Sequence, residues 1–370
     1  MRLFLTIWVF LFLISITSCR GQDINTESGF DQIDKIVTTA IEEKGIPSFA
    51  IGIVKDGDVV YSKTFGLADV EASISAYNQT VYQLGSVTKT FVGLVLSNLI
   101  EKGKISLSDP LSEFFPDSLD FPKGPTGEGI TVQHIATHSA GFPRYPANLE
   151  RVDPEPILGF SKEDLYKGIE LVKTETGPGT DYHYSNFGYG VLGIAMENAT
   201  KMSLNELMST YIFDPLGMKH TVLQLNDKIR KKLATPYLEV DPYKKTQPWQ
   251  MGSLSGAGNV FSTLDDMNAL MLFLLEQNEV NKIQQQSYLP INDSWSYGLG
   301  CFVIASQKQK TKIIYHGGDV DGYASSLTLY PEYDLGFTIL TNYGDGEVVG
   351  EIFTKIGNMI TDTFLTKTDN

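Results

Sequence analysis

The sequence predicts an α/β fold in which an antiparallel sheet is flanked by helices and joined to a mostly helical subdomain. Two observations support this prediction. Strand-like runs occur towards both ends of the 370-residue chain, and helical segments broken by proline and glycine fill its middle. Because strands at both ends need partners, the two ends are expected to join into one sheet, with helices packed on it.

The composition is that of a globular protein, with 42% hydrophobic and 20% charged residues. The formal net charge is −15, so no general attraction to DNA or RNA is expected. Two cysteines do not make a disulfide framework, and beyond the N-terminus no run of about 20 apolar residues would span a membrane. These observations favour an ordinary folded enzyme.

The N-terminus has the features of a secretory signal peptide. Arg2 precedes an almost wholly apolar stretch, 3–14, which is too short for a spanning helix. The segment that ends at Cys19 resembles a bacterial lipobox. We therefore predict a signal peptide at 1–18 and a tether at 19–30 that is lipidated on its cysteine. The protein would then lie in the bacterial cell envelope and touch the membrane only through this anchor; a plain signal peptide is the alternative.

The first part of the body, about 31–80, is expected to contribute to the sheet. Apolar residues recur at helical spacing over 31–44. Two β-rich runs follow at 49–54 and 59–65, and the Asp56-Gly57 pair between them is typical of a hairpin turn.

The middle of the chain, about 81–244, is expected to form the helical subdomain. It begins with a helix over 86–102 that is apolar nearly all round, as is typical of a buried helix. Gly103 follows the helix and is typical of a helix end. Further helices are predicted at 187–200 and 203–212.

The last part, about 245–366, is expected to return to the sheet and to complete a single domain over 31–366. A helix at 262–276 precedes four strands, and a helix at 347–363 ends the chain. The predicted strands are 299–305, 311–316, 325–330 and 335–341.

The first of three short motifs with candidate chemistry opens the buried helix. Ser86 and Lys89 are three residues apart and share one helix face. Burial and a helix N-terminus both lower the pKa of a lysine, so the amine is expected to accept the serine proton. A weak nucleophile beside such a base is what acyl-enzyme chemistry requires, although the same spacing also occurs in solvated helices.

The second motif, Tyr184-Ser185-Asn186, follows a turn rich in glycine and proline at 177–179. A phenol presented there is able to relay a proton, and an amide is able to orient a substrate. Taken alone, the motif also fits an ordinary helix start.

The third motif, His316-Gly317-Gly318, ends the strand predicted at 311–316. Paired glycines on a strand leave room for another backbone, such as that of a substrate. A bulge or turn is the alternative interpretation.

In this order, the motifs resemble those of the penicillin-recognising serine hydrolases, and most closely the branch of class C β-lactamases, DD-peptidases and related esterases. The similarity extends over about 30–345. Further matching segments are Thr137-His138-Ser139-Ala140-Gly141-Phe142-Pro143, Pro215-Leu216-Gly217-Met218 and Ser262-Thr263-Leu264-Asp265-Asp266-Met267. The family implies a β-lactamase/transpeptidase-like fold, a small-molecule or peptide substrate, and neither cofactor nor metal.

The resemblance also implies the catalytic roles. Ser86 would be the acylated nucleophile, Lys89 its general base and Tyr184 the proton shuttle. The backbone N–H groups of Ser86 and Asp319 would form the oxyanion hole.

Four residues would bind substrate. Asn186 would contact a substrate amide, and Gly317 and Gly318 would line the substrate strand. His316 stands where many relatives have lysine, and would either assist Tyr184 electrostatically or hold a substrate carboxylate.

One departure bears on the substrate. β-Lactamases and DD-peptidases usually carry a threonine or serine where this chain has Gly317. Without that hydroxyl, hydrolysis of an ester, amide or peptide is favoured over that of a penicillin. A true β-lactamase or DD-carboxypeptidase remains one alternative. A non-catalytic sensor or scaffold is another, but the intact Ser86, Lys89 and Tyr184 speak against it.

Histidine and cysteine are two further residue types that can form sites. His134 and His138 are spaced like zinc ligands on a helix, but no glutamate follows the first, so packing is favoured for both. Cys301 lies in an apolar, strand-like run and is expected to be a buried, unreactive thiol.

Overall fold

The computed structural model describes residues 26–150, 157–307 and 309–365. The predicted signal peptide, Cys19 and most of the predicted tether lie outside these ranges. Of the helices in the described ranges, none combines the length and the hydropathy needed to cross a bilayer.

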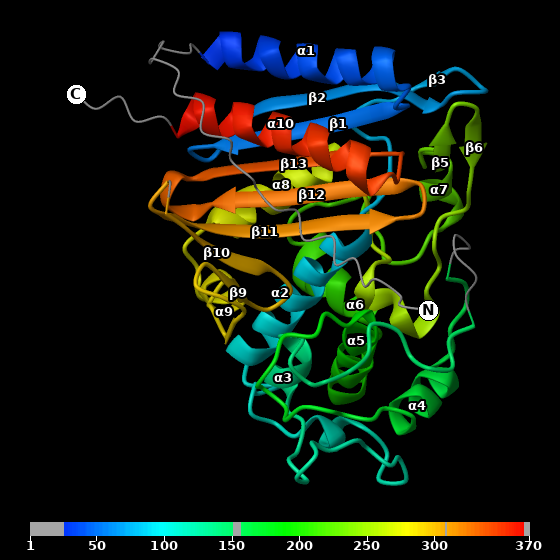
Figure 1. The fold of residues 1–370 in the computed structure, drawn as a ribbon, viewed down its shortest axis with the longest axis vertical. Helices are drawn as coiled ribbons and strands as arrows, with labels where there is room; N and C mark the ends of the chain where they lie inside the picture. The colour runs from blue at the N-terminus through cyan, green and yellow to red at the C-terminus, as the bar shows by residue number, and fades with distance from the viewer. Residues whose placement is uncertain (1–25, 151–156, 308, 366–370) are drawn as a thin grey trace.

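A nine-stranded antiparallel sheet lies at the centre of the described residues and confirms the predicted fold class (Figure 1). Its strand order is β3-β2-β1-β13-β12-β11-β10-β9-β8. The two ends of the chain meet where β1 pairs with β13, with Ile51 opposite Ile339. The strands are β1 (Ser48–Lys55), β2 (Asp58–Asp69), β3 (Ile74–Ser75), β8 (Leu289–Pro290), β9 (Trp295–Tyr297), β10 (Phe302–Ser306), β11 (Thr311–Val320), β12 (Tyr323–Tyr330) and β13 (Leu335–Thr341).

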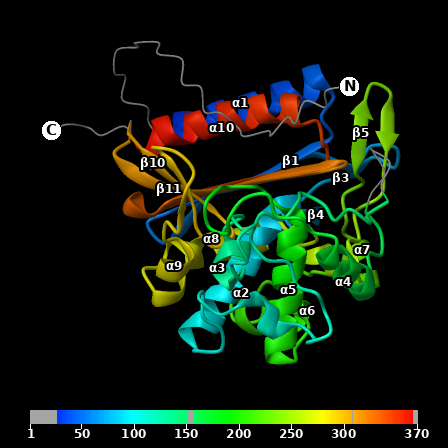
Figure 2. The same cartoon turned by 60° about the horizontal axis from the view of Figure 1, so that its bottom comes forward.

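The first and last helices cover one face of this sheet. α1 (Thr26–Lys44) and α10 (Gly346–Phe364) lie side by side there, as both views show (Figures 1 and 2). Val37 and Ile356 are fully buried in the apolar cluster between these helices and the strands. This burial accounts for the helical spacing of apolar residues at both ends of the chain.

The remaining helices lie on the opposite face (Figure 2). α8 (Leu264–Leu275) packs on β1 and β13, and α2 (Thr88–Glu101) is buried along nearly its whole length, as its apolar sequence predicts. The other helices on this side are α3 (Val132–Ala136), α4 (Lys162–Glu170), α5 (Asn186–Thr200), α6 (Leu204–Met208), α7 (Asp227–Arg230) and α9 (Glu279–Gln284).

Three local differences from the sequence prediction stand out. The helix expected at 203–212 ends at Met208 and continues as a π-helical turn, Ser209–Phe213. A small hairpin, β5 (Tyr237–Val240) with β6 (Tyr243–Lys245), was not predicted. β11 extends beyond residue 316 and includes both glycines of the third motif, because pairing with β12 sets Gly318 opposite Ser325.

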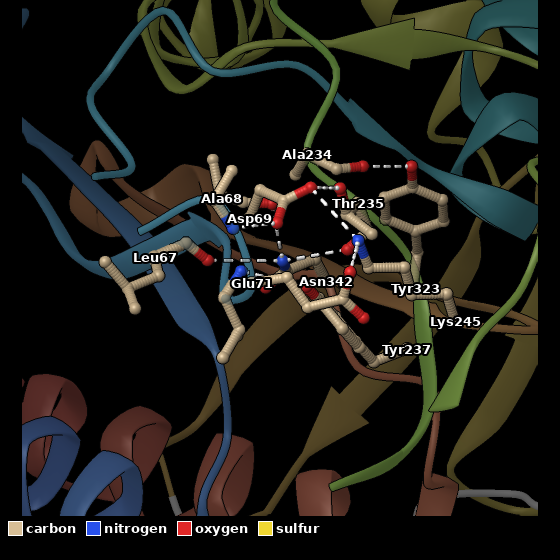
Figure 3. Close-up of polar contacts among 12 residues, drawn as sticks. Leu67, Ala68, Asp69, Glu71, Ala234, Thr235, Tyr237, Lys245, Tyr323 and Asn342 are labelled. Carbon is tan, nitrogen blue, oxygen red and sulfur yellow. Dashed lines mark hydrogen bonds and ion pairs between the residues drawn. The ribbon is translucent and has the colours of Figure 1, made fainter. Parts of the chain in front are cut away.

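Asn342 follows β13 directly. Its side chain connects the sheet to the segment of the chain that returns from the helical region (Figure 3). Its side chain is fully buried. The Nδ2 atom donates to the carbonyl oxygens of Leu67, Ala68 and Thr235 at 3.0–3.4 Å. The Oδ1 atom accepts from the hydroxyl of Ser48 at 2.6 Å. A buried amide with every partner in place rigidifies this junction.

Candidate active site

Ser86 is presented to solvent from an otherwise buried part of the chain. It lies in a 3₁₀ turn, Gly85–Val87, that leads directly into α2. All other residues from 81 to 97 are buried, whereas Ser86 is partly exposed. Gly85 adopts φ +50°, a left-handed conformation that favours glycine, and this turn sets the direction of the serine.

Lys89 lies one turn further along and is fully buried. Its Nζ atom donates to Asn186 Oδ1 at 2.8 Å and to the carbonyl oxygen of Ala257 at 2.7 Å, and it lies 3.2 Å from Ser86 Oγ. Burial, followed by the positive charge of Arg144, holds the pKa of Lys89 well below its usual value. A neutral amine within hydrogen-bond distance of a serine hydroxyl is able to accept its proton.

Tyr184 reaches Ser86 from the loop that precedes α5. Its hydroxyl donates to Ser86 Oγ at 2.8 Å, and Lys89 Nζ lies 4.7 Å from the centre of its ring. Burial raises the pKa of Tyr184, so the side chain is a neutral phenol with a proton to give. The three predicted catalytic side chains are therefore brought together around one oxygen atom.

β11 passes unusually close to the serine turn. A Cβ atom at Gly318 would overlap the carbonyl oxygen of Leu84, and one at Gly85 would lie 2.9 Å from the backbone nitrogen of Asp319. β10 pairs with β11 only as far as Tyr315. The serine turn also packs against β11. The backbone nitrogen of Asp319 thus lies beside the serine turn, but its oxyanion role stays a prediction.

Two predicted substrate-binding residues are occupied by protein contacts. Asn186 is almost fully buried, and its Oδ1 atom accepts from Lys89 as described. His316 is 2% exposed; its Nε2 atom lies 3.2 Å from the hydroxyl of Tyr297 and its Nδ1 atom 2.7 Å from the carbonyl oxygen of Gly317. Both ring nitrogens therefore already have buried partners, and the prediction that His316 holds a substrate carboxylate stays a prediction. The electrostatic alternative stays open.

The other histidines and the thiol have packing environments. His134 Nδ1 accepts from the backbone of Thr131 at the start of α3, and His138 is buried among aromatic rings. Within the described ranges, no group of three or more His, Cys, Asp or Glu side chains is arranged to hold a metal ion. Cys301 is buried, and this burial raises its pKa to about 12, as expected of an unreactive thiol.

Sequence reasoning missed two residues: one beside a catalytic side chain and one that lies between two of the histidines. The guanidinium carbon of Arg144 lies 5.2 Å from the centre of the Tyr184 ring, at an exposed position. Tyr297 lies between His138 and His316. Neither belongs to a motif with a chemical signature, so their proximity is visible only in three dimensions.

Comparison with known protein families shows to which family the chain belongs. The family model described as Beta-lactamase matches residues 33–353, which is most of the chain. The chain belongs to the β-lactamase family. This membership confirms the family resemblance found in the motifs, and it identifies the protein as a relative of serine hydrolases of the β-lactamase type.

Two curated proteins illustrate the similarity over most of the chain. Protein flp of Staphylococcus aureus (strain MW2) is 25% identical over 344 residues, which cover 90% of this chain and 67% of flp. A β-lactamase of Escherichia coli (strain K12) is 29% identical over 271 residues, which cover 72% of this chain and 67% of that enzyme.

Two solved structures share the fold. A penicillin-binding protein homologue from Pyrococcus abyssi, described as octameric, has a TM-score of 0.78 at 25% identity and covers 91% of this chain and 78% of its own. A β-lactamase/D-alanine carboxypeptidase from Yersinia pestis has a TM-score of 0.76 at 21% identity, with 90% and 99% covered.

Proposed function

We propose that the protein is a serine hydrolase that forms an acyl-enzyme on Ser86 and acts on an ester, amide or peptide. The observation that carries the proposal is the meeting of three side chains at Ser86 Oγ: Lys89 Nζ lies 3.2 Å from it, and the Tyr184 hydroxyl donates to it at 2.8 Å. A nucleophile with a tuned base and a proton donor in contact is the arrangement that covalent acyl transfer needs.

In the acylation step, Ser86 Oγ attacks the substrate carbonyl carbon and its proton passes to the neutral amine of Lys89. The backbone N–H groups of Ser86 and Asp319 receive the developing oxyanion; one such donor typically contributes about 3–4 kcal/mol. Tyr184 gives its proton to the leaving group as the scissile bond breaks, and Lys89 restores that proton.

In the deacylation step, water attacks the acyl carbon and gives its proton to the Lys89–Tyr184 pair. Ser86 then leaves as the free hydroxyl by taking that proton back. The same three side chains therefore serve both halves of the reaction.

Gly317 supports the choice of an ester, amide or peptide as substrate, because it offers no hydroxyl to a carboxylate beside the scissile bond. The names of the E. coli and Y. pestis relatives favour a second candidate, a β-lactamase or DD-carboxypeptidase. A non-catalytic sensor or scaffold is disfavoured, since such a protein has no need for the contacts among Ser86, Lys89 and Tyr184.

The test is steady-state hydrolysis of short-chain p-nitrophenyl esters by the wild type and by Ser86→Ala. We expect turnover by the wild type and none above buffer by the variant, with unchanged circular dichroism. If the wild type turns over neither these esters nor the β-lactam nitrocefin, the proposal is overturned in favour of the sensor or scaffold.

We further propose that the chain is exported and anchored in the bacterial cell envelope by lipid on Cys19. The support is the apolar stretch at 3–14, which ends just before a lipobox-like segment.

A further inference from the structure

His138 has a strained backbone and a crowded environment. It adopts φ +60°, which is uncommon for a residue with a side chain, and it is 2% exposed. Its ring centre lies 4.5–4.9 Å from those of Tyr184, Tyr189 and Tyr297. Such strain persists only where the surrounding structure imposes it, so this conformation points to a constraint near the catalytic tyrosine.

The contacts of His138 hold the chain on both sides of Tyr184. Its carbonyl oxygen accepts from the backbone nitrogen of His183 at 2.7 Å. Its Nδ1 atom accepts from the backbone nitrogen of Ser185 at 3.0 Å. The residues immediately before and after the tyrosine are therefore both bound to one histidine.

The hydrogen bonds determine which nitrogen of His138 carries the proton. A backbone N–H only donates, so Nδ1 beside Ser185 must be unprotonated. A neutral ring then carries its proton on Nε2, which lies 3.2 Å from the hydroxyl of Tyr297 and donates to it.

His316 has the opposite tautomer. Its Nδ1 atom faces the carbonyl oxygen of Gly317, which only accepts, so this nitrogen carries the proton. Burial, followed by the charge of Lys89, lowers the pKa of His316 to about 3. Its Nε2 atom is therefore free of a proton and accepts from the hydroxyl of Tyr297 at 3.2 Å.

We propose that His138 is the positioning residue of Tyr184, and that Tyr297 fixes the His138 tautomer while linking it to His316 on β11. The proposal rests on the catalytic role of Tyr184 in the proposed function. The directed chain runs from the Ser185 backbone through His138 and Tyr297 to His316, with every donor matched to an acceptor. It joins the loop that carries the proton donor to the strand beside the serine turn.

Two substitutions of His138 separate its two nitrogens. In His138→Asn, the side-chain oxygen replaces the Nδ1 acceptor, and asparagine tolerates positive φ. In His138→Gln, the terminal amide replaces the Nε2 donor but leaves the Ser185 nitrogen without its acceptor. We expect kcat for ester hydrolysis to fall at least about tenfold in His138→Gln, with KM within about threefold, and to fall less in His138→Asn.

Controls distinguish positioning from general damage. His220→Gln changes a histidine whose ring Nε2 lies 3.0 Å from Lys232 Nζ and whose backbone nitrogen donates to Asp266, and kcat should stay within about twofold. In a Tyr184→Phe background, His138→Gln should add little further loss, because the group that it positions is already gone. Independent, multiplying losses in the double variant, or equal losses in His138→Asn and His138→Gln, would overturn the proposal.

A spectroscopic measurement covers the case in which a variant fails to fold. Nitrogen-15 NMR of histidine-labelled wild-type protein should show His138 as the Nε2–H tautomer and His316 as the Nδ1–H tautomer, and Tyr297→Phe should perturb both. The opposite tautomers, or unchanged histidine spectra in Tyr297→Phe, would overturn the inference. If the tautomers are as expected but Ser86→Ala retains ester turnover, the proposed function is what fails.

Discussion

The Nζ atom of Lys89 lies 3.2 Å from the Oγ atom of Ser86, although the lysine is fully buried and the serine faces solvent. Burial favours the neutral amine, so the ammonium form that dominates on a protein surface is disfavoured here. The general base therefore lies on the buried side of the nucleophile, and the exposed side of the serine stays accessible to a substrate.

Arg144 should tune this base. Its charge is, after burial, the second cause of the lowered pKa of Lys89. Arg144→Gln should raise that pKa and move the acid limb of the kcat/KM profile to higher pH, because Lys89 must be neutral to act. Since Arg144 is exposed, the shift should stay below about one pH unit and shrink in 1 M salt.

Arg144→Lys is the matched control, because it keeps the charge and should leave the acid limb in place. If the acid limb of the kcat/KM profile of Arg144→Gln is unchanged, or moves to lower pH, the result would contradict this electrostatic assignment.

Gly317 should separate substrate classes. We expect wild-type kcat/KM at pH 7 to be higher for short-chain p-nitrophenyl esters than for nitrocefin. Gly317→Thr should shift the ratio towards nitrocefin by supplying a hydroxyl, whereas Gly317→Ala adds only a Cβ atom and should not. A wild-type preference for nitrocefin of about tenfold or more would restore the β-lactamase interpretation.

His316 should make stability depend on pH. Burial, followed by the charge of Lys89, lowers its pKa to about 3 in the folded protein, against about 6.5 when unfolded. Protons therefore bind the unfolded chain more readily between these values. The stability contributed by the neutral ring is complete above pH 6.5 and is lost as the pH falls towards 3.

The variant His316→Gln provides the measurement. It should be less stable than the wild type at pH 7.5, and the difference in unfolding free energy should shrink on acidification by up to about 1.4 kcal/mol per pH unit. Denaturant titrations from pH 7.5 to 4 test this. Parallel pH dependences of the two proteins would show that the ring is not held neutral by folding.

Cys19 should determine membrane association. Cys19→Ser is expected to release the protein from membrane fractions and to abolish labelling with palmitate. Recovery of wild-type protein in the soluble fraction, with a mature N-terminus other than Cys19, would mean that the N-terminal segment is a plain signal peptide.

The sequence predicted the strands and helices in which apolar residues recur at regular spacing. The motif residues Ser86, Lys89 and Tyr184 do lie together in the structure. What it could not supply was contact between side chains distant in sequence. His316 looked available to a substrate because a motif carries no information about burial, and Tyr297 fills the space beside it. The π-helical turn after α6 was missed because helical periodicity does not reveal where a helix tightens or widens.

The most direct test of the central claim is the intact mass of the protein after incubation with a fluorophosphonate, followed by peptide mapping. We predict one adduct, on the peptide that contains Ser86, in the wild type. Ser86→Ala should show none despite an unchanged fold, and Lys89→Ala should be labelled far more slowly. Labelling of Ser86→Ala at wild-type rate on another serine would contradict the assignment of Ser86 as the nucleophile.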